Sequence, residues 1–142
     1  MKFNDLDLSE WQQSDINTDS LWIIPSRDKT GKHKNIYHGN FIPQIPNQLI
    51  RRYTKENEVV FEPFMGSGTT LFECENLGRK YIGFDINQKM IDYVAENIEG
   101  SQANKFYITN CNAMDKESVE ANFRAYQCSA QFLIMPPLYG YC

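Results

Sequence analysis

Residues 62–70 form the stretch of this sequence that is best suited to chemistry, and they read Glu-Pro-Phe-Met-Gly-Ser-Gly-Thr-Thr. The stretch follows a short apolar run at residues 59–61 and leads into a segment with helical spacing at residues 69–77. Gly66 and Gly68 carry no Cβ, so the backbone there can turn sharply and approach a ligand closely. A helix that begins after such a turn directs unpaired N–H groups toward the ligand. The pattern therefore predicts a cofactor loop at the carboxyl end of a parallel strand.

Three classes of cofactor bind to loops of this kind, and the residues discriminate between them. A nucleoside triphosphate needs a Lys in the loop, and none follows Gly68. A dinucleotide prefers a small residue at the last position of the Gly motif, where Leu71 stands. S-adenosylmethionine is a cation without phosphate, and the carboxylate of Glu62 at the start of the loop suits its ammonium group. The loop favours S-adenosylmethionine, with a nicotinamide-dinucleotide-binding oxidoreductase domain as the remote alternative.

Two polar residues follow the next two apolar runs of the sequence. Asp85 comes after residues 80–84, at a spacing where an acidic side chain can accept hydrogen bonds from both ribose hydroxyls of a nucleoside. Its alternative role is to cap the next helix, although Asn87 is better placed for that. Asn112 comes after residues 106–108 and could bind an adenine edge through its amide, or simply form a turn.

The motif in residues 62–70 resembles the cofactor motif of the DNA amino-methyltransferases, which usually reads Asp-Pro-Phe-x-Gly-Ser-Gly-Thr-Thr. Residues 41–46 are similar to the family segment that closes over the methionine end of the cofactor. The resemblance implies transfer of a methyl group from S-adenosylmethionine to the exocyclic amino group of adenine or cytosine in double-stranded DNA, in a restriction–modification system. The cofactor-binding residues that it implies are Phe41, Glu62, Pro63, Phe64, Gly66, Gly68, Thr69, Asp85, Ile86, Asn112 and Ala113.

The catalytic motif of the same family is a polar residue, two prolines and an aromatic residue, and it follows the fourth strand. The polar residue aligns the amino nitrogen with the methyl group, and the aromatic ring stacks on the flipped base. The resemblance thus implies Pro136, Pro137 and Tyr139 as catalytic residues, in a degenerate motif with Met135 at the polar position. Because Met offers no useful acceptor, we expect the isolated chain to transfer methyl groups weakly or not at all. The alternative is a non-catalytic S-adenosylmethionine-binding module that a partner chain completes.

The elements that must position these residues alternate along the chain. Short apolar runs predict strands, and apolar residues at helical spacing predict helices. The expected strands are residues 59–61, 80–84, 106–108 and 131–134, and the expected helices are residues 46–53, 69–77, 87–98 and 116–126. This alternation predicts an α/β fold of the Rossmann-like type, a parallel sheet with helices on both faces.

The family topology implies a seven-stranded sheet, and we expect only about four of its strands here, in the spatial order third, second, first, fourth. We therefore expect a chain that is truncated after the catalytic motif. Residues 1–20 are predicted to be a loosely held polar lead-in, and residues 21–142 the N-terminal part of a methyltransferase domain without a target-recognition domain. The fourth strand would be an apolar edge that pairs with other strands. We expect a homo-oligomer or a complementing C-terminal chain, unless residues 21–24 cover that edge.

Composition is that of one ordinary globular domain, with 142 residues, 42% hydrophobic and 23% charged. The net charge of −4 does not indicate a strongly basic nucleic-acid module. The basic residues 27–34 are either a solvated loop or a phosphate-contacting patch. The four cysteines are widely spaced, so we expect no metal site and reduced thiols. With no signal peptide and no run of about 20 apolar residues, we expect a cytoplasmic protein with no membrane contact.

Overall fold

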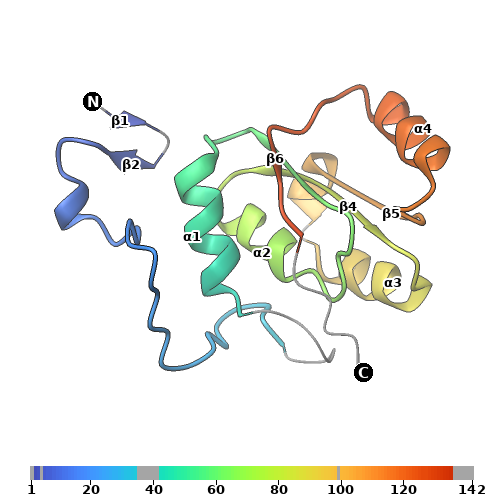
Figure 1. Ribbon diagram of the computed structural model, residues 1–142. Helices are drawn as coiled ribbons and strands as arrows, with labels where there is room; N and C mark the ends of the chain where they lie inside the picture. Colours follow the sequence, from blue (N-terminus) through green and yellow to red (C-terminus); the bar gives the residue numbers. More distant parts are fainter. Residues whose placement is uncertain (1, 4, 35–41, 99, 136–142) are drawn as a thin grey trace.

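A parallel four-stranded sheet forms the centre of the computed structural model, which describes residues 2–3, 5–34, 42–98 and 100–135 (Figure 1). Its strands are β3 (Val59–Glu62), β4 (Lys80–Asp85), β5 (Phe106–Asn110) and β6 (Phe132–Leu133). They lie in the order β5-β4-β3-β6, and each pair is parallel. This is the spatial order that the family topology implies, so that prediction is confirmed.

Helices cover both faces of the sheet, as the alternation predicts (Figure 1). One face packs on α1 (Gln44–Tyr53), α2 (Thr69–Asn76) and α3 (Gln88–Asn97), and the other on α4 (Lys116–Tyr126). The first three helices contribute buried apolar side chains to one cluster with the sheet, namely Ile50, Leu71, Phe72, Cys74, Ile91 and Val94. The layers are therefore helix, sheet, helix, which leaves the carboxyl ends of the strands for a ligand.

The ends of these elements lie close to the predicted ones, and the differences have local causes. Asn87 caps α3 as expected, because its side chain accepts a hydrogen bond from the Lys89 N–H. Helix α1 begins two residues earlier than predicted, at Gln44 rather than at Pro46. Helix α3 ends at Asn97, one residue before the predicted end at residue 98, and Gly100 begins the 3-10 helix η2 (Gly100–Lys105).

The N-terminal segment contacts the body of the fold, so the expectation of a loosely held lead-in is wrong. It contains the strands β1 (Lys2–Phe3) and β2 (Leu6–Asp7), which pair antiparallel, and the 3-10 helix η1 (Trp11–Gln13). The Asp5 carboxylate lies 2.9 Å from Nη2 of Arg79, which is buried. Farther along, Arg51 of α1 donates two hydrogen bonds to Asp15, at 2.9 and 2.6 Å.

Residues 21–24 do not cover the edge of the sheet. Leu21 and Ile23 are 75% and 85% exposed and belong to no strand. Instead Tyr53, the last residue of α1, stacks on Phe132 of β6 with ring centroids 5.8 Å apart. The predicted cover by residues 21–24 is therefore wrong, and Tyr53 covers the face of β6 at Phe132 rather than its edge.

Two side chains of the basic residues 27–34 pair with acidic residues of α2, so only part of this segment, Lys29–Gly31 and Lys34, is exposed as the predicted solvated loop would be. The Lys32 ammonium lies 2.5 Å from the Glu75 carboxylate. His33 is buried, with its Nε2 2.5 Å from Glu73 Oε1. These pairs fix the segment on α2. Within the described residues, we find no helix with the length and apolar character that crossing a bilayer requires.

Candidate cofactor site

The loop between β3 and α2 lies at the carboxyl edge of the sheet, where the sequence predicts it. Two of its hydrogen bonds hold the turn: Met65 N donates to Phe84 O at 2.8 Å and Gly68 N donates to Met65 O at 3.2 Å. Gly66 and Gly68 have φ of 55° and 81°, in the left-handed region that favours Gly. A Cβ on Gly68 would also lie 2.9 Å from a Val94 methyl group. Both glycines are therefore required by the backbone that they form.

Asp85, the last residue of β4, joins this loop to the start of α3. Its Oδ2 accepts a hydrogen bond from Gly66 N at 2.7 Å, and its Oδ1 accepts one from Asn87 N at 2.8 Å. The bond from Asn87 N shows the alternative role of Asp85 at the start of α3, and ribose binding stays a prediction. A carboxylate accepts about four hydrogen bonds in total. Asp85 therefore retains acceptor capacity for the hydroxyls of a ribose.

Glu62 lies inside the protein and not in the crevice. It is 1% exposed. Its Oε1 accepts a hydrogen bond from the Thr70 hydroxyl at 2.8 Å, and its Oε2 accepts one from the Tyr81 hydroxyl at 2.5 Å. Burial raises the pKa of Glu62 to about 8, against the lowering effect of these two hydrogen bonds. This buried position does not support the predicted contact between Glu62 and the ammonium group of the cofactor.

Three other predicted residues of the loop differ in solvent exposure. Pro63 and Thr69 are buried at the two ends of the turn, and Phe64 is half-buried. Gly68 is the N-terminal cap of α2 and has no side chain to bond the first N–H groups of that helix. The turn thus exposes few side chains, and the N–H groups of Gly66 and Gly68 already donate to Asp85 and Met65.

The ends of β4 and β5 bring the remaining predicted residues together. Cys111 N donates to Asp85 O at 3.1 Å, and the Asn110 side chain donates to Ile86 O at 3.0 Å. Ile86, which directly follows Asp85, is 74% exposed and so presents an apolar surface at this edge of the sheet. Asn112 is exposed, and its Oδ1 accepts a hydrogen bond from Met114 N at 3.0 Å. That bond forms the turn that the sequence left as an alternative, and the Asn112 amide nitrogen remains able to donate.

These residues fit the nucleoside half of S-adenosylmethionine. An apolar surface at Ile86 suits the face of an adenine ring, and the carboxylate of Asp85 suits the ribose hydroxyls. Ala113, which is half-buried, follows Asn112 in the same turn. The site thus combines a backbone turn, an acid and an apolar surface at one edge of the sheet.

Comparison with known proteins agrees with this arrangement. A family model described as DNA methylase matches residues 2–96, which is more than half of the chain. This chain belongs to the DNA methylase family. The match takes in most of the polar segment at residues 2–20 as well as the cofactor loop and Asp85.

Curated relatives of this DNA methylase are type II methyltransferases that are considerably longer. M.HindIII of Haemophilus influenzae is 32% identical over 110 residues, which are 74% of this chain and 34% of that protein. M.HpaI of Haemophilus parainfluenzae is 39% identical over 90 residues, 63% of this chain and 28% of that protein. M.MjaII of Methanocaldococcus jannaschii is 33% identical over 84 residues, 55% of this chain and 16% of that protein. The chain therefore spans about a third or less of the length of these relatives.

A solved structure, that of TrmN from Thermus thermophilus, is similar to this methylase at a TM-score of 0.45 and 22% identity. The likeness covers 52% of this chain and 24% of TrmN. The fold assignment rests on the sheet order and the helical layers of the methylase itself and not on this likeness.

The predicted catalytic residues Pro136, Pro137 and Tyr139 lie outside the described residues, as does Phe41. Met135, at the polar position of the motif, is described and exposed. It directly follows Ile134, whose N–H donates to Phe61 O in β3 at 2.9 Å. Met135 therefore lies at the same sheet edge as the loop between β3 and α2.

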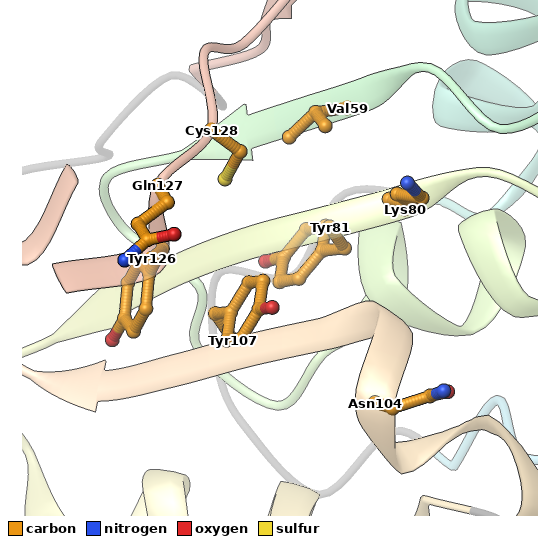
Figure 2. A pocket seen from close by; sticks show the side chains of 8 residues that line it. All are labelled: Val59, Lys80, Tyr81, Asn104, Tyr107, Tyr126, Gln127 and Cys128. Atoms are coloured by element: carbon orange, nitrogen blue, oxygen red, sulfur yellow. The ribbon is translucent and has the colours of Figure 1, made fainter. Parts of the chain in front are cut away.

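A cavity of about 300 Å³ lies at the opposite edge of the sheet, and Figure 2 shows the side chains around it. Val59 and Lys80 in its lining are the first residues of β3 and β4, so the cavity lies at the amino ends of the strands. The rings of Tyr107 and Tyr126 stack in it, with centroids 4.4 Å apart. None of the predicted site residues lines this cavity.

Thr70, Tyr81 and Gly83 are residues near the site that the sequence analysis missed. Thr70 and Tyr81 bond to Glu62, and a Cβ on Gly83 would lie 2.4 Å from the Tyr81 ring. Gly83 is the one signal in the sequence that could have revealed this arrangement, because a Gly inside an apolar strand marks the close approach of another side chain.

Proposed function

We propose that this chain provides the S-adenosylmethionine-binding part of an enzyme that methylates the exocyclic amino group of adenine or cytosine in DNA, as in restriction–modification systems. The observation that carries the proposal is the hydrogen bond between Asp85 and Gly66, at 2.7 Å, which joins the acid to the glycine turn at the carboxyl edge of the sheet. Membership of the DNA methylase family and the similarity to type II methyltransferases support it.

Bound S-adenosylmethionine supplies an activated methyl group on its sulfonium. In this proposal the chain holds its nucleoside half. Asp85 accepts the ribose hydroxyls, the exposed Ile86 packs on the adenine ring, and the Asn112 amide donates to an adenine nitrogen. The turn at Gly66 and Gly68 faces the amino acid half, and Val94 packs beside Gly68.

The acceptor base is proposed to bind at the sheet edge that carries Met135. Met135 follows β6 at the edge that also carries the cofactor loop. In this proposal a flipped base of double-stranded DNA enters at this edge of the sheet, with Pro136, Pro137 and Tyr139 as the catalytic residues that the family motif implies. A cytoplasmic location, where bacterial DNA lies, belongs to this proposal.

Two assays test the proposal in sequence. Calorimetric titration of the chain with S-adenosylhomocysteine, the demethylated product, is expected to show one site per chain. Transfer of tritiated methyl groups to mixed-sequence duplex DNA is the second assay. Absence of any cofactor binding would refute the proposal.

A non-catalytic cofactor-binding module, completed by a second chain, is the other candidate function. It is favoured by Met135, whose thioether is a poor acceptor at the position where the family motif has a polar residue. It is also favoured by β6, whose Leu133 is 53% exposed at the edge of the described sheet. Binding of S-adenosylhomocysteine without methyl transfer would support this candidate, whereas sequence-specific transfer by the chain alone would refute it.

A further inference from the structure

A buried contact closes the base of the cofactor loop, away from the crevice itself. Glu62 is the last residue of β3, and Thr70 lies in the first turn of α2. The Thr70 hydroxyl donates to Glu62 Oε1 at 2.8 Å, so one hydrogen bond joins the two ends of the loop at residues 63–69. The other carboxyl oxygen accepts a hydrogen bond from the Tyr81 hydroxyl at 2.5 Å. All three side chains are almost completely buried.

The sequence of β4 makes room for this contact. Gly83 pairs with Glu62 across the parallel register of β3 and β4. Tyr81 stands two residues earlier on the same face of β4, and its ring lies over Gly83. A Cβ at Gly83 would lie 2.4 Å from Tyr81 Cε1 and 2.7 Å from the hydroxyl oxygen. Gly83 therefore provides the space in which Tyr81 reaches Glu62.

We propose that Glu62, Thr70 and Tyr81 form a buried brace that holds the cofactor loop in its binding conformation without touching the cofactor. The inference rests on the proposed function, because it assigns the loop to cofactor binding. Under this proposal Glu62, Thr70 and Tyr81 are all positioning residues, which act on the cofactor through the loop.

The burial of Glu62 argues that it positions the loop and does not bind the cofactor directly. A direct ligand would need an ionised carboxylate that faces the crevice. Glu62 is 1% exposed, and internal hydroxyls donate to both of its oxygens. A buried carboxyl without a cationic partner is more stable in the neutral form. A neutral amide of the same shape should therefore replace it with little effect.

Calorimetry with S-adenosylhomocysteine on four brace variants tests the proposal. Tyr81→Phe and Thr70→Val each remove one hydroxyl from the brace and are expected to weaken the affinity by about three- to tenfold. Thr70→Ser keeps the hydroxyl and should stay within about twofold of the wild type, as a conservative rescue. Glu62→Gln should stay within about threefold. The matched control is Tyr126→Phe, because the Tyr126 hydroxyl bonds to Thr109 on the other face of the sheet.

Amide hydrogen exchange on the free chain supplies a second readout that needs no ligand. The brace predicts faster exchange at Gly66–Thr70 in Tyr81→Phe and in Thr70→Val, with unchanged exchange in α4. Unchanged loop exchange and unchanged affinity in both variants would overturn the proposal. So would a loss of more than tenfold in Glu62→Gln alone, which would make Glu62 a direct ligand. A wild type that binds no S-adenosylhomocysteine would refute the proposed function, while the exchange data would still decide the brace.

Discussion

Asp85 is the side chain on which the nucleoside half of the site depends. Asp85→Ala removes the acceptor of the Gly66 N–H and the acceptor proposed for the ribose hydroxyls. Loss of a charged acceptor should weaken S-adenosylhomocysteine binding by about 1.5–3 kcal/mol, measured by calorimetry. Asp92→Ala, on the exposed side of α3, is the matched control and should bind as the wild type does. Unchanged affinity in Asp85→Ala would exclude this placement of the cofactor.

Glu62 gives the stability of the chain a specific pH dependence. Its pKa is about 8 in the folded chain and near 4.5, the ordinary pKa of a Glu carboxyl, when the chain is unfolded. Because the folded state holds the proton more tightly, the contribution to stability is complete below pH 4.5 and is lost as pH rises through 8. The free energy of unfolding of the wild type should therefore fall relative to that of Glu62→Gln across this range, by a few kcal/mol in total. Urea unfolding of both proteins at pH 5, 7 and 8.5 measures the difference, and a constant difference would contradict the assignment.

The sequence was sufficient to find the glycine turn and Asp85, but it did not predict that the Glu62 side chain points into the protein. Glycines and an acid at fixed places after strands are local features that a motif records. The direction of Glu62 depends on Tyr81 and Gly83, which come from the neighbouring strand. A side chain whose partners lie on another element has no signature in its own motif.

The N-terminal strands β1 and β2 are attached to the fold through Arg79. This buried guanidinium donates to Asp5, to Thr54 and to Leu77 O. Asp5→Ala leaves the guanidinium without its carboxylate partner and should lower the free energy of unfolding by about 1–3 kcal/mol. Chemical denaturation measures the loss, and Asp19→Ala at an exposed position serves as the control. Equal stability of the two variants would show that the pair does not hold the segment.

The strands and helices of the sheet were predictable, because their apolar residues follow the period of each element and two of the helices have a side-chain cap. Asn87 before α3 is such a cap, and the structure confirms it. The docking of residues 5–17 was not predictable, because their contacts are polar pairs with distant residues such as Arg51 and Arg79. The same holds for His33, whose partner Glu73 lies in α2.

The edge of the sheet at β6 predicts how chains associate. Leu133 is 53% exposed on this strand, and within the described residues no strand pairs with its outer side. An apolar edge without charge is a template for pairing, so light scattering should show self-association that rises with concentration. Leu133→Lys should reduce it, whereas Leu21→Lys, at an exposed position outside the sheet, should not. A wild type that stays monomeric at high concentration would contradict the prediction.

The cavity at the amino ends of the strands had no counterpart in the sequence analysis. Its lining comes from separate elements, among them Lys80 of β4, Tyr107 of β5 and Tyr126 of α4 (Figure 2). No motif joins these residues along the chain, so only the folded arrangement brings them together.

The two edges of the sheet offer the most direct test of where the cofactor binds. Backbone amide chemical shifts of the labelled chain can be followed while S-adenosylhomocysteine is added. Binding at the carboxyl edge predicts saturable shifts at Gly66, Gly68, Asp85 and Ile86, with Tyr107 and Tyr126 unchanged. Shifts confined to Tyr107, Tyr126 and the other residues of the opposite cavity, or no shifts at all, would contradict the account.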